Sequence, residues 1–215
     1  MIISIETRWI HLNQYLPNDI QTEDAYVLII KNGINCLLND NDGACKLYAE
    51  QDALEKDTKA KMRGRVVNKR ARYNLCFAEE SQEPDYENGK GTIISFQQVP
   101  LLNELRNKFG SIIPEANDLQ VEGNYYYNLK ECGIGFHGDT ERRKVIGVRL
   151  GATIPLVYVW YHKHEPVTEV INTEELKLEN GDIYFMSEKA TGFDWKRSSK
   201  YTLRHAAGSN KYISI

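Results

Sequence analysis

Hydrophobic and polar positions change their periodicity along the chain. From Val99 to Phe109 the apolar residues recur at helical spacing, so the sequence predicts one amphipathic helix there. Pro100 sits where a first helical turn tolerates proline, and Gly110 predicts the end of the helix. Residues 25–31 form an apolar run closed by a turn signal, which predicts a buried strand. The composition of residues 46–62 favours a second helix.

From residue 119 onward the pattern is that of short strands. Helical segments followed by a run of strands predict an α+β protein. We expect its core to be a double-stranded β-helix, or jelly roll, with supporting helices outside and a strand order that can be permuted. The expected strands are 121–128, 133–138, 144–151, 154–161, 167–172, 182–186 and 201–206.

The length of 215 residues fits a single domain. We expect residues 1–60 to form an N-terminal extension. The core would then span residues 61–215 and include the supporting helix of residues 95–110. The formal net charge of −3 excludes binding of polyanions over the whole surface and still allows a local basic face.

The four cysteines show no Cys-x-x-Cys spacing, which indicates reduced thiols rather than disulfides or a zinc site. The opening segment lacks a basic region followed by a long apolar run, and no stretch approaches about 18 apolar residues. We therefore expect an intracellular protein of the cytoplasm or nucleus, monomeric and without a membrane partner.

Two segments are rich in basic side chains. Residues 56–72 are either a solvated connector or an arm that contacts phosphates. Residues 187–200 mix basic and aromatic side chains, and form either an exposed loop anchored by Trp195 or a nucleic-acid contact. The basic residues are Lys56, Lys59, Lys61, Arg63, Arg65, Lys69, Arg70 and Arg72 in the first segment, and Lys189, Lys196, Arg197 and Lys200 in the second.

The chemistry of the chain centres on His137-Gly138-Asp139 and the distant His205. On a strand, residues two apart point to the same side, so His137 and Asp139 can bind one ion together. Two imidazoles and one carboxylate form the ligand set of mononuclear Fe(II) oxygenases and leave other metal positions open. His162 and His164 are an alternative pair, but they lack a suitably placed carboxylate, so we interpret them as residues at a strand end.

Residues 122–151, EGNYYYNLKECGIGFHGDTERRKVIGVRLG, resemble the AlkB family of Fe(II)- and 2-oxoglutarate-dependent dioxygenases. The resemblance extends over residues 120–208. It rests on Asn124-Tyr125-Tyr126, the Gly133 and Gly135 turn, His137-Gly138-Asp139, Leu150-Gly151, the Gly181-Asp182 step before an apolar strand, and His205.

The resemblance implies Fe(II) and 2-oxoglutarate as cofactors, with His137, Asp139 and His205 as catalytic metal ligands. It also implies that Asn124 and Tyr126 hydrogen-bond 2-oxoglutarate, although a tyrosine-rich core strand is the alternative. Side chains implied to face the primary substrate are Glu141, Arg142, Trp195, Lys196 and Arg197.

The implied reaction is demethylation or hydroxylation of a modified base in DNA or RNA, as in DNA repair, on single strands or a flipped base. Two alternatives remain open. One is a protein or peptide hydroxylase with the same cofactors. The other is a β-barrel binding domain that retains the metal residues without catalysis.

The chain departs from the family pattern after His205, where ten residues follow and none is arginine. The family places there an arginine that pairs with the distal carboxylate of 2-oxoglutarate. Residues 72–77, RYNLCF, resemble this missing strand, so we hypothesise a permuted order in which Arg72 holds the carboxylate and Asn74 points the same way. An ordinary core strand is the alternative. The competing clamp is Lys211, and Arg149 and Arg204 are weaker candidates.

Overall fold

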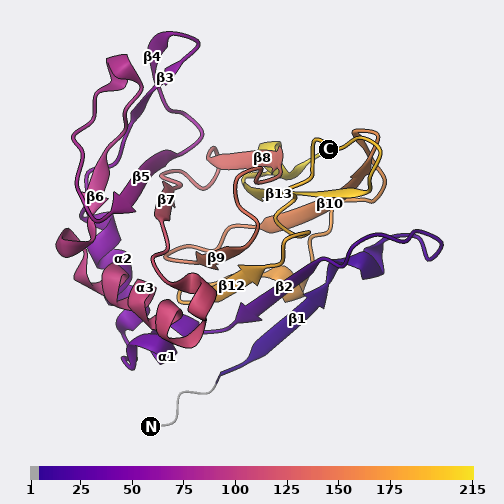
Figure 1. The fold of residues 1–215 in the computed structure, drawn as a ribbon, viewed down its shortest axis with the longest axis horizontal. Helices are drawn as coiled ribbons and strands as arrows, with labels where there is room; N and C mark the ends of the chain where they lie inside the picture. The colour runs from indigo at the N-terminus through magenta and orange to yellow at the C-terminus, as the bar shows by residue number, and fades with distance from the viewer. Residues whose placement is uncertain (1–4) are drawn as a thin grey trace. The chain divides into compact units, whose positions relative to one another are not determined.

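The computed structural model describes residues 5–215, and Met1 to Ser4 of the opening segment lie outside the described residues. The chain forms an α+β fold of mostly antiparallel sheets, as predicted at that level. It divides into two compact units (Figure 1). The described part of the first unit comprises residues 5–34 and 129–215, and the second comprises residues 35–128.

The first sheet of the first unit contains β1 (Thr7–His11), β2 (Tyr26–Ile30), β12 (Ile183–Met186) and β9 (Val145–Val148), in the order β1-β2-β12-β9. All its pairings are antiparallel. The N-terminal strands are therefore integral to this sheet, because β2 pairs with β12 from the far end of the chain. The boundary expected at residue 60 does not coincide with the limits of the two units, which meet after residues 34 and 128.

The second sheet of the first unit contains β11 (Glu165–Pro166), β10 (Leu156–His162), β13 (Thr202–Gly208) and β8 (Gly133–His137), in that order. Residues 156–161 of β10 are all buried, so this strand forms the centre of the core. The short helix α4 (Asn210–Ile213) packs against the same sheet through Ile213. Two 3₁₀ turns complete the unit, at Leu12–Tyr15 and Glu174–Leu176.

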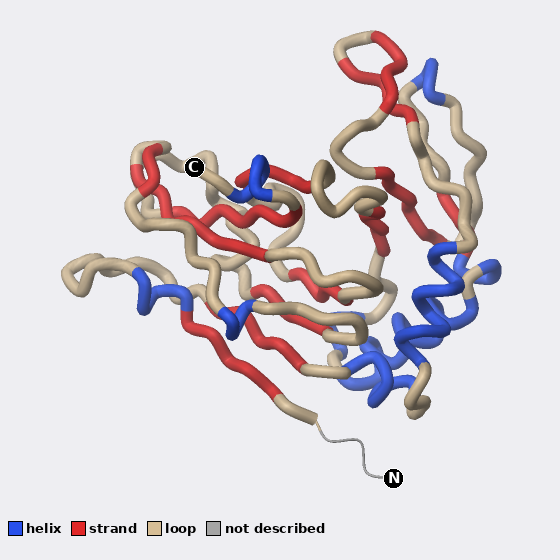
Figure 2. Tube along the Cα trace, turned by 180° about the vertical axis from the view of Figure 1, so that it is seen from behind, coloured by secondary structure: helices blue, strands red, loops and turns tan. Residues whose placement is uncertain are grey.

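The second unit holds the longer helices (Figure 2). The helix α1 (Gly33–Leu38) begins at the end of the first unit and is followed by α2 (Gly43–Asp52) and α3 (Pro100–Ile112). A hairpin pairs β3 (Lys59–Met62) with β4 (Arg65–Asn68). A further sheet has the order β6 (Ile93–Ser95), β5 (Tyr73–Ala78), β7 (Val121–Tyr125), with 3₁₀ turns at Tyr86–Asn88, Phe96–Gln98 and Pro114–Ala116.

The helix predictions need two corrections. The helix predicted for residues 46–62 begins at Gly43 and ends at Asp52. The last four residues of the predicted range, 59–62, form the strand β3 instead. The reason is the turn that follows them, because Arg63 and Gly64 both have positive φ, as in a two-residue hairpin turn. The helix predicted for residues 99–109 is confirmed, but it begins at Pro100 and continues through Gly110 to Ile112.

Two strand predictions also change. Residues 167–172 do not form a continuous strand, since only Ile171 bridges to Tyr158 there, and the paired strand is the short β11. Residues 73–78 do form a strand, but β5 pairs with β6 and β7 in the second unit and not with the sheets of the first. The strands that the N-terminal half supplies to the first unit are β1 and β2, so the predicted closing role of RYNLCF is wrong.

Candidate metal centre

The two histidines come together through strand register. His205 of β13 pairs with His137 of β8 on one side and with Tyr158 of β10 on the other. Residues directly opposite each other in a sheet project to the same face, so the three side chains form one row across the sheet. The two imidazole rings lie 4.3 Å apart between centroids. The register therefore joins residues that are 68 positions apart in sequence.

Asp139 lies just beyond the end of β8. Its backbone N–H donates to the carbonyl of Thr191 over 2.9 Å, which fixes the motif to the segment between β12 and β13. Asp139 Oδ1 lies 3.9 Å from His137 Nε2. One ligand atom from each of His137, Asp139 and His205 lies within 4.8 Å of the other two. Within residues 5–215, this is the group of three or more ligating side chains that could hold a metal ion.

The hydrogen bonding of the histidines suits a metal. The Nδ1 atom of His137 lies 2.8 Å from the Gly135 carbonyl oxygen and can donate a hydrogen bond to it. With its proton on Nδ1, the ring presents the lone pair of Nε2 to a metal ion. His205 has a buried Nδ1 without a hydrogen-bond partner. Burial first, then His137 and Arg142, lower the pKa of His205 to about 3, so its ring stays neutral and able to ligate near neutral pH.

The spacing is also close to what a six-coordinate ion requires. Metal–nitrogen distances of about 2.1 Å place adjacent ligand atoms about 3.0 Å apart. His137 Nε2 and Asp139 Oδ1 are 3.9 Å apart, and the three ligand atoms lie within 4.8 Å of one another, so the side chains would have to draw together around an ion. The residues therefore fit Fe(II), whose frequent protein ligands are two histidines and a carboxylate.

Charged residues follow the motif directly. Arg142 pairs with the ligand carboxylate of Asp139, with Nη1 3.5 Å from Oδ1. Arg143 bonds Glu188 over 2.6 Å and lies over the ring of Phe193 at 5.5 Å. Glu141 is exposed. Of the predicted substrate residues here, Arg142 is the one that contacts the metal-ligand set.

The segment after β12 packs onto the motif at Gly138. A Cβ atom on Gly138 would lie 2.6 Å from Trp195 Cδ1 and closer still to the Gly192 carbonyl oxygen. The half-buried Trp195 thus covers the motif, while Lys196 lies over its ring at 5.6 Å and Arg197 is exposed. Trp195 therefore has a packing role, as one of the two interpretations predicted.

A buried ion pair fixes the same segment. Lys189 Nζ donates to Asp194 Oδ2 over 2.9 Å and to Glu23 Oε2 over 3.0 Å. The Lys189 and Asp194 side chains are 2% and 0% exposed. Lys189 is therefore a structural residue rather than a free cation.

The residues predicted to bind 2-oxoglutarate lie mainly in the second unit. Arg72 Nε and Asn74 Nδ2 each donate to Asn124 Oδ1 over 2.6 Å, so these three side chains form one cluster. Tyr126 follows β7 and is half-buried. Lys211 belongs to α4 of the first unit, and its Nζ lies 5.0 Å over the ring of Tyr212. Their roles toward 2-oxoglutarate stay predictions.

The alternative histidine pair has other partners. His162 stacks on Tyr201 with 4.4 Å between ring centroids. His164 Nδ1 lies 3.4 Å from Arg204 Nη2, and the Arg204 guanidinium lies 3.9 Å over the ring of Tyr161. This pair therefore belongs to an aromatic and cationic cluster at the end of β10.

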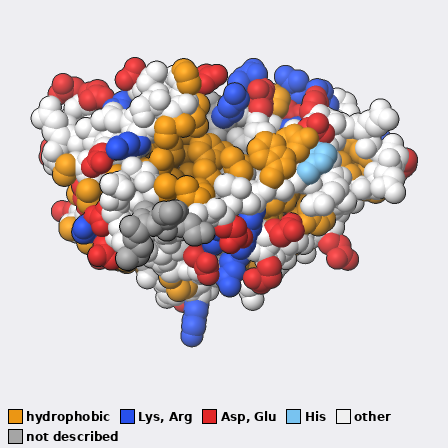
Figure 3. Space-filling view, turned by 90° about the horizontal axis from the view of Figure 1, so that it is seen from below, with side chains coloured by type: hydrophobic (Ala, Val, Ile, Leu, Met, Phe, Trp, Pro, Cys, Tyr) orange, Lys and Arg blue, Asp and Glu red, His pale blue; other side chains and the backbone are white. Residues whose placement is uncertain are grey.

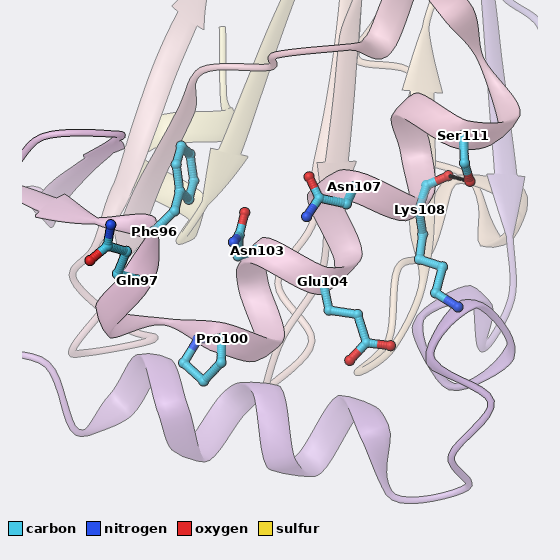
Figure 4. Close-up of a pocket in the computed structure, with 8 residues that line it drawn as sticks. All are labelled: Phe96, Gln97, Pro100, Asn103, Glu104, Asn107, Lys108 and Ser111. Atoms are coloured by element: carbon cyan, nitrogen blue, oxygen red, sulfur yellow. Dashed lines mark hydrogen bonds between the residues drawn. The ribbon is translucent and has the colours of Figure 1, made fainter.

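Sequence reasoning named Arg149 as a weaker candidate for the clamp, but it did not connect Tyr158 or Tyr184 with the metal ligands. Tyr158 lies in the strand predicted for residues 154–161, and only the register of β10 with β13 shows that it stands beside His205. A depression of the second unit lies along α3 and the turn before it (Figure 4). It is lined by residues such as Pro100, Asn103 and Asn107, and none of the predicted site residues lines it.

No helix within residues 5–215 is both long and apolar enough to cross a bilayer. A comparison with models of known protein families found no match. A comparison with curated proteins found an uncharacterized protein, R156, of Acanthamoeba polyphaga mimivirus. It is 49% identical over 189 residues, which cover 88% of this chain and 72% of the relative. The chain therefore belongs to the same protein family as uncharacterized protein R156 of Acanthamoeba polyphaga mimivirus.

Proposed function

We propose that the protein is an Fe(II)- and 2-oxoglutarate-dependent dioxygenase that oxidises a modified base in DNA or RNA. The observation that carries the proposal is the grouping of His137, Asp139 and His205, whose ligand atoms lie within 4.8 Å of one another. The two antiparallel sheets of the first unit support the finer expectation of a jelly-roll core.

The reaction would convert 2-oxoglutarate and O₂ to succinate and CO₂, with the second oxygen atom entering a substrate C–H bond; the metal and the oxo acid supply this chemistry when bound. The protein's part is to hold the metal on one face with three side chains. Arg142 stands beside Asp139, and its positive charge would help to hold that carboxylate in place. Trp195 over Gly138 would exclude water from the motif.

The β3–β4 hairpin supports a nucleic-acid substrate. Lys59, Lys61, Arg63 and Arg65 are exposed, and no acidic side chain of residues 5–215 forms an ion pair with them. Lys61 donates to a backbone carbonyl, that of Glu87. Unpaired exposed cations are the groups that exchange counterions for phosphates.

The electrostatic attraction between the protein and a nucleic acid would be confined to the β3–β4 hairpin. Figure 3 shows one face of the molecule, where apolar side chains gather near the centre and acidic and basic side chains are scattered around them. The formal net charge of the chain is −3. A polyanion would therefore be held through the hairpin rather than through a field over the whole protein.

Succinate formation tests the proposal. Purified protein is incubated with Fe(II), O₂ and 2-oxoglutarate, alone and with a methylated or an unmodified single-stranded oligonucleotide, and His137→Ala serves as the ligand-deficient variant. We expect turnover that the methylated oligonucleotide stimulates and that the variant lacks. Turnover without stimulation would point to a protein or peptide hydroxylase, and no turnover with metal bound would point to a binding domain.

The hairpin is tested through salt dependence. The double change Arg63→Gln and Arg65→Gln should weaken oligonucleotide binding and reduce the slope of log K against log salt by about 1 for each lost phosphate contact. Lys108→Gln, an exposed lysine of α3, is the matched control. An unchanged slope in the double variant would remove the hairpin from the substrate surface.

A further inference from the structure

The outer edge of the first sheet has no partner strand. β1 is the terminal strand in the order β1-β2-β12-β9, and within residues 5–215 no strand pairs with its outer side (Figure 1). A free edge presents a row of backbone donors and acceptors on which a further strand can form. Many proteins protect such an edge with a proline or a β-bulge, but β1 has neither, since its register with β2 is regular from Thr7 to His11.

The pairing with β2 decides which backbone groups of β1 face outward. The N–H of Lys31 donates to the Glu6 carbonyl over 2.9 Å, so Glu6 and Lys31 form a hydrogen-bonded pair. Such pairs alternate with non-hydrogen-bonded ones along an antiparallel ladder, so the even-numbered residues of β1 bond to β2. The N–H and C=O groups of Thr7 and Trp9 therefore point away from β2. Within residues 5–215, no turn or loop bonds to them.

Two large apolar side chains lie exposed along this edge. Trp9 is 64% exposed and Ile5 is 49% exposed. Residues four apart in an extended segment project to the same face, so both side chains lie on one side of the edge. The Trp9 ring contacts Tyr26 of β2, with 5.0 Å between ring centroids, and the rest of its surface is open to solvent. A single exposed apolar residue is ordinary, but two on one face of an unpaired edge indicate a surface that another chain covers.

The edge is complementary to itself. In chain order it reads Ile5-Glu6-Thr7-Arg8-Trp9. When two copies pair in antiparallel fashion about a two-fold axis at Thr7, the two Thr7 residues lie opposite each other and Glu6 of each copy lies opposite Arg8 of the other. Ile5 of each copy then lies opposite Trp9 of the other. Acidic meets basic and apolar meets apolar twice across the axis, which is the pattern that stabilises antiparallel pairs.

We propose that the protein forms a homodimer in which β1 pairs with β1 of a second copy, antiparallel and centred on Thr7. The outward backbone groups of Thr7 and Trp9 then bond to the second copy, and the two four-stranded sheets become one continuous sheet. Glu6 and Arg8 already pair within one copy, with Arg8 Nε 2.7 Å from Glu6 Oε1. The dimer brings two such pairs together as a group with no net charge. This dimer replaces the monomer expected from the sequence, and it does not depend on the metal centre.

Other registers and other partners fit this edge less well. A two-fold axis at Trp9 would place Arg8 opposite Ile10. It would also place Glu6 opposite Leu12, so each charge would face an apolar side chain. Ile10 and Leu12 are moreover buried within one copy, where they already pack in the core. An unrelated strand would need the same order of acidic, polar and basic side chains, whereas a second copy of this chain supplies it.

Sedimentation equilibrium of the full chain tests the proposal. The wild type should approach twice the chain mass of 24.8 kDa as its concentration rises through the micromolar range. Thr7→Pro removes an outward N–H that β2 does not use, so it should leave the fold intact and weaken self-association at least about tenfold. Thr7→Val keeps that N–H and is the matched control. A wild type that stays at the mass of one chain, or a Thr7→Pro variant that dimerises equally well, overturns the proposal.

A charge exchange tests the partner's identity. Glu6→Arg and Arg8→Glu each place like charges opposite one another across the axis, so each should weaken the dimer at least about tenfold. The double variant restores opposite charges and should recover the dimer of the wild type. If both single variants dimerise normally, or the double variant fails to recover while it keeps the Tm of the wild type, the pairing of Glu6 with Arg8 is wrong.

Disulfide trapping reads the register. Opposite residues of a hydrogen-bonded pair have Cα atoms about 5.5 Å apart, which a disulfide can span. Thr7→Cys should therefore give a covalent dimer under mild oxidation, whereas Trp9→Cys should not, because Ile5 lies opposite it. The wild type, whose Cys45 and Cys76 are exposed, supplies the background. Trapping of Trp9→Cys in preference to Thr7→Cys, or no trapping above the background, would overturn the pairing centred on Thr7.

Discussion

The glycine inside the His-Gly-Asp motif should be intolerant of a single methyl group. In Gly138→Ala the new Cβ would lie 2.6 Å from Trp195 Cδ1, and nearer still to the Gly192 carbonyl oxygen. Real Cβ atoms essentially never approach another heavy atom closer than 3.0 Å, so something must move. The carbonyl is backbone, and it cannot turn away as a flexible side chain could.

The energetic cost follows from what has to shift. Overpacking a tight contact costs about 1–3 kcal/mol, and loosening the bond from Asp139 N–H to the Thr191 carbonyl adds about 1 kcal/mol. A total of about 2–4 kcal/mol corresponds to a fall in Tm of about 4 to 16 °C for a chain of this length. Because His137 and Asp139 flank the glycine, Mn²⁺ affinity should also fall at least tenfold, as for other disturbed ligand positions.

Thermal unfolding and Mn²⁺ titration measure the two effects. The matched control is Gly135→Ala on the same strand, because a Cβ there meets nothing within 4 Å. Its stability should stay within about 1 kcal/mol of the wild type. If Gly138→Ala unfolds and binds Mn²⁺ like Gly135→Ala, the packing of Trp195 and Gly192 on the motif does not constrain the site.

Three further predictions concern single side chains. Asp139→Asn should weaken Mn²⁺ by more than about 100-fold, since a neutral amide replaces the only anionic ligand; equal affinity in a calorimetric titration would exclude Asp139 from the metal. The folded pKa of His205, about 3, lies below its unfolded value of 6.5, so between these pH values the unfolded state binds more protons. The neutral His205 ring should therefore stabilise the metal-free protein fully above pH 6.5, and this stabilisation should be lost as the pH falls toward 3. In urea unfolding, the free energy of unfolding should fall less between pH 7 and pH 4.5 in His205→Gln than in the wild type. An equal fall in both proteins would refute this pH dependence of His205. Asp194→Ala leaves Lys189 buried without its closest counter-charge and should cost about 3 kcal/mol, a fall in Tm of about 6 to 12 °C by differential scanning fluorimetry; a fall below 2 °C would mean that the pair is not important for stability.

The sequence was most informative where local physics decides structure. The apolar spacing after Pro100 predicted α3, and the runs around residues 26–30 and 156–162 predicted buried strands. It failed at residues 59–62, whose composition suits a helix, because a hairpin turn at Arg63 and Gly64 pairs them as a strand. Gly110 did not end its helix, since one glycine inside a packed helix costs only about 1 kcal/mol and tertiary contacts can outweigh it.

The site shows the same division. The spacing of His137 and Asp139 is a local property, because the alternation of a strand brings them to one side of the backbone. That His205 joins them depends on the register of β13 with β8, and that Tyr158 stands next to it depends on the register of β10 with β13.

By itself, therefore, the sequence determined which side chains could ligate a metal, and it determined the strands and helices whose apolar periodicity is strong, such as α3, β2 and β10. Only the tertiary structure decided which strands became neighbours, that β5 joined a different sheet, and that Arg149 was left buried without a partner. The physical reason is that periodicity is set by neighbours along the chain, whereas pairing and burial are set by contacts between residues far apart in it.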